Sequence, residues 1–108
     1  MTADRSGGTG RIDFARVNRA ALADLPAVLR RRLPDGRMIG GEFIARNPTR
    51  NDRCPGSFKI NIRTGRWADF ATGDGGSDPV SLIAYLDTCS QGEAARRLAA
   101  ELGNQIDE

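Results

Sequence analysis

The most constraining feature of the sequence is an alternating segment that runs directly into a turn. In residues 57–63, "SFKINIR", every second side chain is apolar, which is the period of a half-buried β-strand. Thr64-Gly65 suits a hairpin turn, and "RWADFA", residues 66–71, follows as the return strand. The apolar members of the first strand are Phe58, Ile60 and Ile62. The fold must therefore accommodate an antiparallel hairpin with one apolar face.

The register of this hairpin decides which face of the return strand is buried. One register places Trp67 and Asp69 on the apolar face of the first strand, and the other places Ala68 and Phe70 there. The second register gives the more uniformly apolar face. The sequence therefore favours burial of Ala68 and Phe70, and it leaves Trp67 and Asp69 beside polar neighbours.

Two helices are predicted before the hairpin. Residues 13–23 carry an apolar stripe at helical spacing. Pro26 fits the first turn of a second helix, because a proline ring clashes inside a helix but not at its start. The turn formers Pro34-Asp35-Gly36 end this second helix. Residues 41–46 are then predicted as a short strand.

Two further helices are predicted after the hairpin. Ser77 or Asp78 caps the first of them, which has Pro79 in its opening turn. "SQGE", Ser90 to Glu93, has the pattern of a capping box and opens the last helix. The expected fold is α+β, with a small three-stranded antiparallel sheet packed with two N-terminal and two C-terminal helices.

A length of 108 residues suits one small domain, which we place at residues 13–103. Residues 1–12 are small and polar and are expected to form a disordered tail, and residues 104–108 a frayed one. No apolar run approaches membrane-spanning length, and the first residues lack the apolar core of a signal peptide. We therefore expect a cytoplasmic protein that does not bind a membrane.

Histidine is absent and cysteine occurs only at Cys54 and Cys89. A Ser/His or Cys/His catalytic arrangement is therefore excluded within this chain. Two cysteines cannot complete a four-ligand zinc site, and in a cytoplasmic protein they are expected to be free thiols. We also find no cluster of acidic residues that would hold a catalytic divalent metal. No catalytic residue and no cofactor is expected.

The net charge of +2 is unevenly spread along the chain. Residues 1–66 carry a net charge of +8 and residues 67–108 a net charge of −6. All but one of the 16 basic residues are arginine, whose planar fork pairs phosphates and stacks on bases. This polarity indicates an anionic partner for the first part of the chain. An arginine-rich codon usage, with solvated side chains, explains the composition equally well.

A family resemblance is carried by residues 47–60, "NPTRNDRCPGSFKI", together with residues 65–86, "GRWADFATGDGGSDPVSLIAYL". These segments resemble the zinc-ribbon domain at the N-terminus of bacterial and phage DNA primases. That family has a Cys-Pro-x-His pair, a Pro-Ser-Phe strand, a Cys-Phe-x-Cys pair, a Gly-Gly-Asp loop and a helix. "NPTR", "PGSF", "DFAT" and "GGSD" stand at the corresponding places here. The matched order of elements covers residues 24–103.

None of the family's metal-ligating residue types is present at the four ligand positions. The four ligand positions fall on Asn47, Arg50, Asp69 and Thr72, none of which is a thiolate or an imidazole. We therefore expect no zinc. We expect instead a charge-assisted pair between Arg50 and Asp69, with Asn47 and Thr72 completing the hydrogen bonds. The alternative is that all four side chains are solvated loop residues.

The glycine loop "TGDGGSD", residues 72–78, has no Gly-Lys-Ser/Thr sequence, so it is not a P-loop. Glycines before a helix can bind phosphate, but Asp74 and Asp78 would repel it. Tight-turn geometry is the better explanation for these glycines.

In primases the resembling domain helps to recognise single-stranded template DNA and presents it to a separate catalytic domain. The resemblance thus implies a non-catalytic module of a primase-like replication protein of a phage, plasmid or mobile element. Its expected partners are single-stranded DNA and a primase or helicase catalytic domain. Basic side chains beside an exposed aromatic are typical of single-strand binding. The expected contact residues are Arg46, Arg50, Arg53, Lys59, Arg63, Arg66 and Trp67.

Two alternatives stay open. Trp67 is either a stacking platform or a core residue. If Arg50 is held by Asp69, it is not available to phosphate. The second function class is a protein-interaction module that docks on a replication protein without binding DNA. A DNA-binding module should carry its basic residues on one contiguous face, whereas a docking module should expose apolar side chains on its last helices.

Overall fold

A computed structural model describes residues 12–53 and 55–103. The tails expected at 1–12 and 104–108 lie outside these residues, except for Ile12, and so does Cys54. Two helices, five consecutive strands and two further helices follow one another along the described part of the chain. In chain order they are α1 (Phe14–Ala23), α2 (Leu25–Arg32), β2 (Arg37–Ile39), β3 (Glu42–Ala45), β4 (Phe58–Asn61), β5 (Trp67–Asp69), β6 (Asp74–Gly76), α3 (Pro79–Asp87) and α4 (Gln91–Leu102).

The helices begin where short polar side chains accept backbone hydrogen bonds. Asp13 caps α1 by accepting from the Arg16 N–H, and Ser90 caps α4 by accepting from the Glu93 N–H. Asp78 and Ser81 form a reciprocal capping box at the start of α3, with Pro79 in its first turn.

The sheet is antiparallel and its spatial order, β2-β3-β4-β5-β6, follows the chain. The α+β class with four helices is confirmed, but the expected number of strands was wrong, since the sheet has five rather than three. Both additional strands, β2 and β6, lie at the edges and have three residues each. Segments this short hold too few residues for an alternating pattern to be recognised, and each adjoins glycines that suggest loops.

The register favoured from the sequence was also wrong. Trp67 pairs with Ile60, and Asp69 pairs with Phe58. Trp67 and Asp69 therefore face the core, while Phe70 is 72% exposed. The apolar count favoured the other register, but it took no account of the partners that the folded chain supplies for the indole N–H and the carboxylate.

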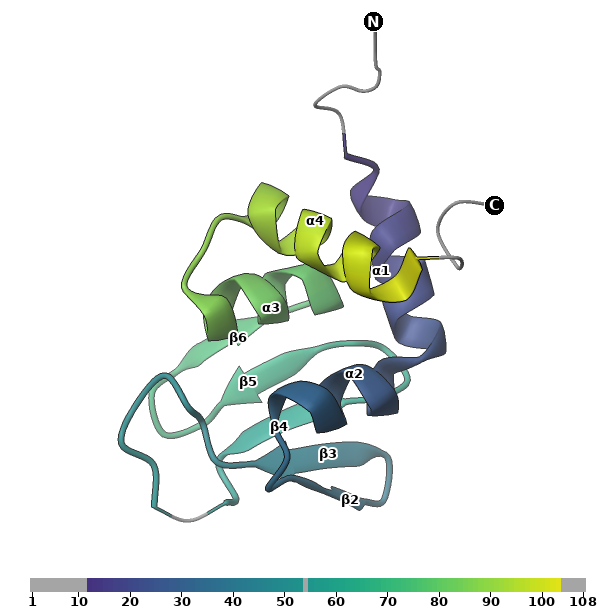
Figure 1. Cartoon of the computed structure of the whole chain (residues 1–108). Helices are drawn as coiled ribbons and strands as arrows, with labels where there is room; N and C mark the ends of the chain where they lie inside the picture. The colour runs from purple at the N-terminus through teal and green to yellow at the C-terminus, as the bar shows by residue number, and fades with distance from the viewer. Residues whose placement is uncertain (1–11, 54, 104–108) are drawn as a thin grey trace, which may run out of the picture.

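All four helices lie on one side of the sheet (Figure 1). The inward-facing strand residues pack with the apolar stripes of the helices in one core. Its largest fully buried side chains include Phe43, Phe58, Leu25, Leu29, Leu33, Ile60, Leu82, Ile83 and Leu98. The opposite side of the sheet has no covering helix among the described residues. The fold thus leaves one sheet face available to solvent.

Trp67 is packed into this core from β5, the strand next to the edge strand β6. Its ring centroid lies 4.7 Å from that of Tyr85 and 6.3 Å from that of Phe58, and its indole Nε1 donates to Ser81 Oγ at 2.9 Å. A Cβ at position 76 would lie 2.5 Å from the indole nitrogen. Gly76 is therefore required by close packing against Trp67. This agrees with the geometric explanation of the glycine loop, although residues 74–76 form a strand rather than a loop.

Candidate nucleic-acid interface and the Asp69 network

The segment between β3 and β4 brings Asn47 and Arg50, two of the four positions expected to form a polar network, to Asp69. Asn47 Nδ2 donates to Asp69 Oδ2 at 2.8 Å. Arg50 donates from Nε to Oδ2 at 2.8 Å and from Nη2 to Oδ1 at 3.3 Å, so its guanidinium meets both carboxylate oxygens. The Ala71 N–H donates to Oδ1 at 2.9 Å. A buried carboxylate thus receives hydrogen bonds from two side chains and one backbone amide.

The contacts continue from Asn47 to α3. Asn47 Nδ2 also donates to Tyr85 Oη at 2.8 Å, and the Tyr85 hydroxyl donates to Asp74 Oδ2 at 2.8 Å. Thr49 donates to Asn47 Oδ1 from its backbone N–H at 2.9 Å and from its hydroxyl at 2.7 Å. The Asn47 amide therefore uses both donors and its acceptor. We call Asn47, Thr49, Arg50, Asp69, Asp74 and Tyr85 the Asp69 network.

Asp69 is completely buried, and Asn47 is 1% exposed. The hydrogen bonds from Arg50 hold the pKa of Asp69 well below its usual range, against the opposing effect of burial, with Asn47 and the Ala71 N–H adding to the effect. The same contact raises the pKa of the Arg50 guanidinium. The pair is therefore charged at neutral pH, and its cation stays partly in contact with solvent.

Thr72 does not reach the Asp69 carboxylate. Its hydroxyl contacts the Asp69 backbone carbonyl at 3.5 Å and accepts from the Asp74 N–H at 3.2 Å. Of the four expected positions, Asn47, Arg50 and Asp69 meet at one point, while Thr72 serves the turn that follows β5. The network members Thr49, Asp74 and Tyr85 were not expected from the sequence, and neither were Ser57 and Asp52, which contact Arg50. Tyr85 lies on a helix far along the chain, and no local pattern indicates its contact with Asn47.

No group of three or more His, Cys, Asp or Glu side chains comes together as a metal site in the described part of the chain. The position next to the Asp69 carboxylate is taken by the Arg50 guanidinium. Asn47, Arg50 and Asp69 together provide a single carboxylate already engaged by a cation, which does not suit a zinc ion.

The outward-facing residues of the sheet form a second feature, which we call the outer face. Strand pairing sets Ile44 beside Lys59 and Lys59 beside Ala68, so their side chains share this side. The outer face comprises Arg37, Ile39, Glu42, Ile44, Lys59, Asn61, Arg66, Ala68 and Phe70. It contains three cations and one carboxylate, and it includes Ile39 and Phe70, two of the large apolar side chains that are exposed.

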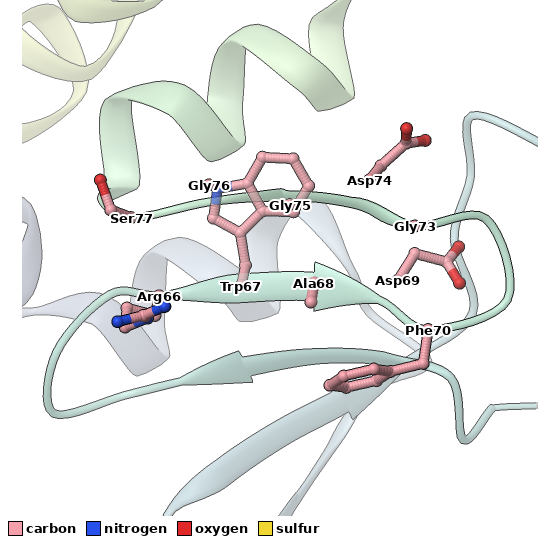
Figure 2. Close-up of a pocket in the computed structure, with 10 residues that line it drawn as sticks. All are labelled: Arg66, Trp67, Ala68, Asp69, Phe70, Gly73, Asp74, Gly75, Gly76 and Ser77. Atoms are coloured by element: carbon pink, nitrogen blue, oxygen red, sulfur yellow. The ribbon is translucent and has the colours of Figure 1, made fainter.

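Phe70 is the most exposed large apolar side chain among the described residues, at 72%. The Lys59 ammonium lies 5.9 Å from the centroid of its ring, within the range of a cation–π contact. Figure 2 shows that Trp67 and Phe70 point to opposite sides of the sheet. Sequence reasoning therefore selected the wrong aromatic, because it had no means to fix the register.

Two shallow depressions adjoin Phe70. One, of about 520 Å³, is shown in Figure 2, and its lining includes Phe70, Ala68, Gly75 and Arg66. The other has a volume of about 320 Å³ and extends over β3, β4 and β5. We call the second the β4-side depression; it is lined by Glu42, Lys59, Asn61, Arg66, Trp67, Ala68 and Phe70. Both are lined by Arg66 and Phe70, so the two depressions adjoin each other at these residues.

The structure separates the basic residues that were expected to contact DNA. Lys59 and Arg66 lie on the outer face and make no ion pair within residues 12–53 and 55–103. Arg63 is exposed in the turn between β4 and β5, and Arg53 is exposed in the segment before β4. These four residues keep a free cationic group within the described structure.

Three expected contact residues are differently engaged. Arg46 is exposed but pairs with Asp35 at 3.1 Å. Arg50 is ion-paired with Asp69, so its guanidinium is not a free cation for phosphate binding. Trp67 is 6% exposed, and its indole N–H is bound by Ser81, so the hypothesis of a Trp67 stacking platform was wrong. Its large apolar ring gains more from burial between the sheet and α3 than from exposure.

No protein-family model matches the chain, and no curated protein sequence matches it at a significant level. Among the helices that the structure describes, none has the length and apolar character needed to cross a membrane.

Proposed function

We propose that this chain is a non-catalytic module that binds single-stranded DNA through the outer face of its sheet. The observation that carries the proposal is an exposed phenylalanine with unpaired cations beside it on an open sheet surface. Phe70 offers a flat ring to a base, and Lys59 and Arg66 lie where they would meet the flanking phosphates.

The chemistry of this surface suits a single strand better than a duplex. Unpaired bases expose their rings, and stacking on an aromatic side chain contributes about 1–3 kcal/mol per base. Free cations add an attraction to phosphate that does not depend on sequence. Since Phe70 and Arg66 line both depressions and Lys59 lines one of them, a strand lying across this surface would meet the ring and the cations together.

The resemblance to primase zinc-ribbon domains supports the same class of ligand. On this proposal the Asp69 network fills the place of the metal and holds the segment before β4, while a catalytic domain lies elsewhere, on this protein or on another. The biological setting would be a primase-like replication protein of a mobile element in the cytoplasm. A primase or helicase would then be the protein partner.

The alternative of a docking module has less support. It calls for exposed apolar side chains on the last two helices. The large apolar side chains exposed in the described part of the chain are Phe14, Ile39 and Phe70, none of which belongs to α3 or α4. Two of the three lie on the same sheet face as Lys59 and Arg66.

The test is fluorescence anisotropy of a labelled thymine oligonucleotide titrated with the full chain at several salt concentrations. We expect the logarithm of the binding constant to fall linearly with the logarithm of salt concentration, with a slope set by the few phosphates contacted. Phe70→Ala should weaken binding about fivefold or more, and Arg66→Gln should both weaken binding and reduce the slope.

Arg30→Gln is the matched control for Arg66→Gln. Arg30 is exposed on α2, on the helical side of the molecule, and makes no ion pair within the described residues. The control removes the same charge and should leave the salt slope unchanged. Equal losses in the two arginine variants, or no binding at low salt by the unaltered protein, would contradict the proposal.

A further inference from the structure

We infer that the β4-side depression selects guanine over the other bases, with Glu42 and Asn61 contacting the edge of a base that stacks on Phe70. This inference rests on the proposed function and adds to it a base preference and the residues that determine it. The starting point is Glu42, which is the one carboxylate among the described residues of the outer face.

Glu42 is unusual because it is not neutralised by its neighbours. Lys59 and Arg66 line the same depression, yet the Glu42 carboxylate makes no ion pair or hydrogen bond within residues 12–53 and 55–103. A free carboxylate among cations repels phosphate. It favours nucleic-acid binding only if it accepts hydrogen bonds from the donor groups of a base.

Strand pairing places Asn61 directly opposite Glu42. Side chains opposite each other on one face of an antiparallel pair lie close enough to contact the same ligand group. Asn61 Oδ1 already accepts from the backbone N–H groups of Arg63 at 2.9 Å and Thr64 at 3.1 Å. These bonds fix the orientation of the amide and leave its Nδ2 donors without a partner in the described structure.

The depression therefore presents two carboxylate acceptors beside an amide donor. The Watson–Crick edge of guanine carries the complementary pattern, with two neighbouring donors, N1–H and N2–H, followed by the acceptor O6. Adenine and cytosine each place one donor group, an exocyclic amine, on this edge, and thymine places one ring N–H between two carbonyls. Guanine is thus the base that can engage both Glu42 oxygens and Asn61 Nδ2 at once.

The position of Phe70 makes this reading of an edge feasible. Phe70 lines the same depression as Glu42 and Asn61. The depression has a volume of about 320 Å³, which is at the lower end for small-ligand sites. A base whose face lies on the ring would direct an edge along the sheet surface towards β3 and β4. Single-strand binders read exposed edges of stacked bases in this way.

The experiment uses four labelled thymine oligonucleotides that differ only at the central position, which carries guanine, adenine, cytosine or thymine. Anisotropy titrations with the full chain should show about fivefold or more tighter binding to the guanine oligonucleotide, the lower end expected for a bidentate base contact. Equal affinity for all four would overturn the inference while leaving the proposed function standing. Absence of binding to any of them would overturn both.

The variant Glu42→Gln distinguishes recognition of guanine by the carboxylate from simple repulsion of phosphate. The variant keeps the size of the side chain and removes its charge, so binding to thymine should strengthen slightly while the guanine preference disappears. A carboxylate that only repels phosphate would instead give the same strengthening for all four oligonucleotides and leave the preference unchanged, which would contradict the inference. Glu93→Gln on α4, where Glu93 pairs with Arg97, removes the same charge on the helical side of the molecule and should preserve the preference.

Asn61→Asp provides a second variant with an independent readout. An aspartate keeps an oxygen for the Arg63 and Thr64 N–H groups, so the turn is retained, but the donor to guanine O6 is replaced by an acceptor. We expect the guanine preference to fall by about fivefold. An unaltered preference in a variant with an unchanged circular dichroism spectrum would remove Asn61 from the site.

Discussion

The two faces of the sheet at β5 differ in whether the protein itself buries their aromatic rings and supplies hydrogen-bond partners for their polar groups. On the inner face, the Trp67 N–H is bound by Ser81, and the Asp69 carboxylate is bound by Arg50 and Asn47. On the outer face, Phe70 is exposed and the Lys59 ammonium lies 5.9 Å from the centroid of its ring. The inner groups are therefore committed to stability, and the outer groups are available for a ligand.

The comparison also shows how a single register decides which residues have which role. Neighbouring strand residues point to opposite faces, so a shift by one residue would turn Ala68 and Phe70 towards the core and Trp67 and Asp69 towards solvent. The four predictions that follow test the contrast between the faces, beginning with the largest expected effect on stability.

Replacing Trp67 with alanine should lower the free energy of unfolding by about 3–5 kcal/mol, because it leaves a cavity between the sheet and α3 and removes the partner of Ser81. Urea unfolding followed by far-ultraviolet circular dichroism measures the change. A loss of unfolding free energy below about 1 kcal/mol would mean that the indole is not a core group. It would contradict the contrast drawn between the inner and outer faces.

Replacing Asp69 with asparagine should cost about 2–4 kcal/mol. The variant removes the charge that compensates Arg50 and turns one acceptor oxygen into a donor group, while the side-chain volume is preserved. The matched control is Asp74→Asn, at the exposed end of the same network, which should cost under about 1 kcal/mol in the same urea experiment. Similar losses in both variants would contradict the central position of Asp69.

The pH dependence of stability sharpens the assignment of Asp69. Its pKa is lowered in the folded protein, so on acidification the unfolded chain takes up the proton first. The contribution of Asp69 is thus fully present above the unfolded-state pKa of about 3.9 and is lost as the pH falls towards the lower folded-state pKa.

The measurement compares urea midpoints of the unaltered protein and Asp69→Asn at several pH values between about 6 and 3. The difference in unfolding free energy between the two should shrink as the pH falls. A difference that stays constant over this range would show that Asp69 has no lowered pKa.

Replacing Phe70 with alanine should change the free energy of unfolding by less than about 0.5 kcal/mol, because the ring is already mostly in solvent. The same variant should lose DNA affinity, so stability and binding separate on the outer face. A loss of stability close to that of Trp67→Ala would show that the two faces do not differ in the way described.

The sequence was informative where a pattern is local. Several features depend on residues within a few positions of one another. They are helix α1, the proline at the start of α2, the caps at Asp78 and Ser90 and the alternation of β4. The pairing of Arg50 with Asp69 followed from a different kind of information, the element order of the resembling family, and the structure contains that contact.

The sequence was misleading where the outcome depends on distant partners. An aspartate on an apolar strand face is unfavourable unless a cation reaches it, and the cation comes from 19 residues earlier in the chain. Tyr85 enters the network from α3, 38 residues after Asn47. Since no local rule contains these separations, counting apolar residues favoured the wrong register and the wrong aromatic.

The sequence by itself thus determined the four helices, three of the five strands, the α+β class and the side chains from which a polar network could be built. Tertiary structure decided the register of β5, the burial of Trp67 and Asp69, and the exposure of Phe70 beside Lys59 and Arg66. The physical reason is that helix, turn and strand preferences are set by local backbone sterics and spacing. The cost of burying a charge or an indole N–H is set by which partners the complete fold brings within hydrogen-bonding distance.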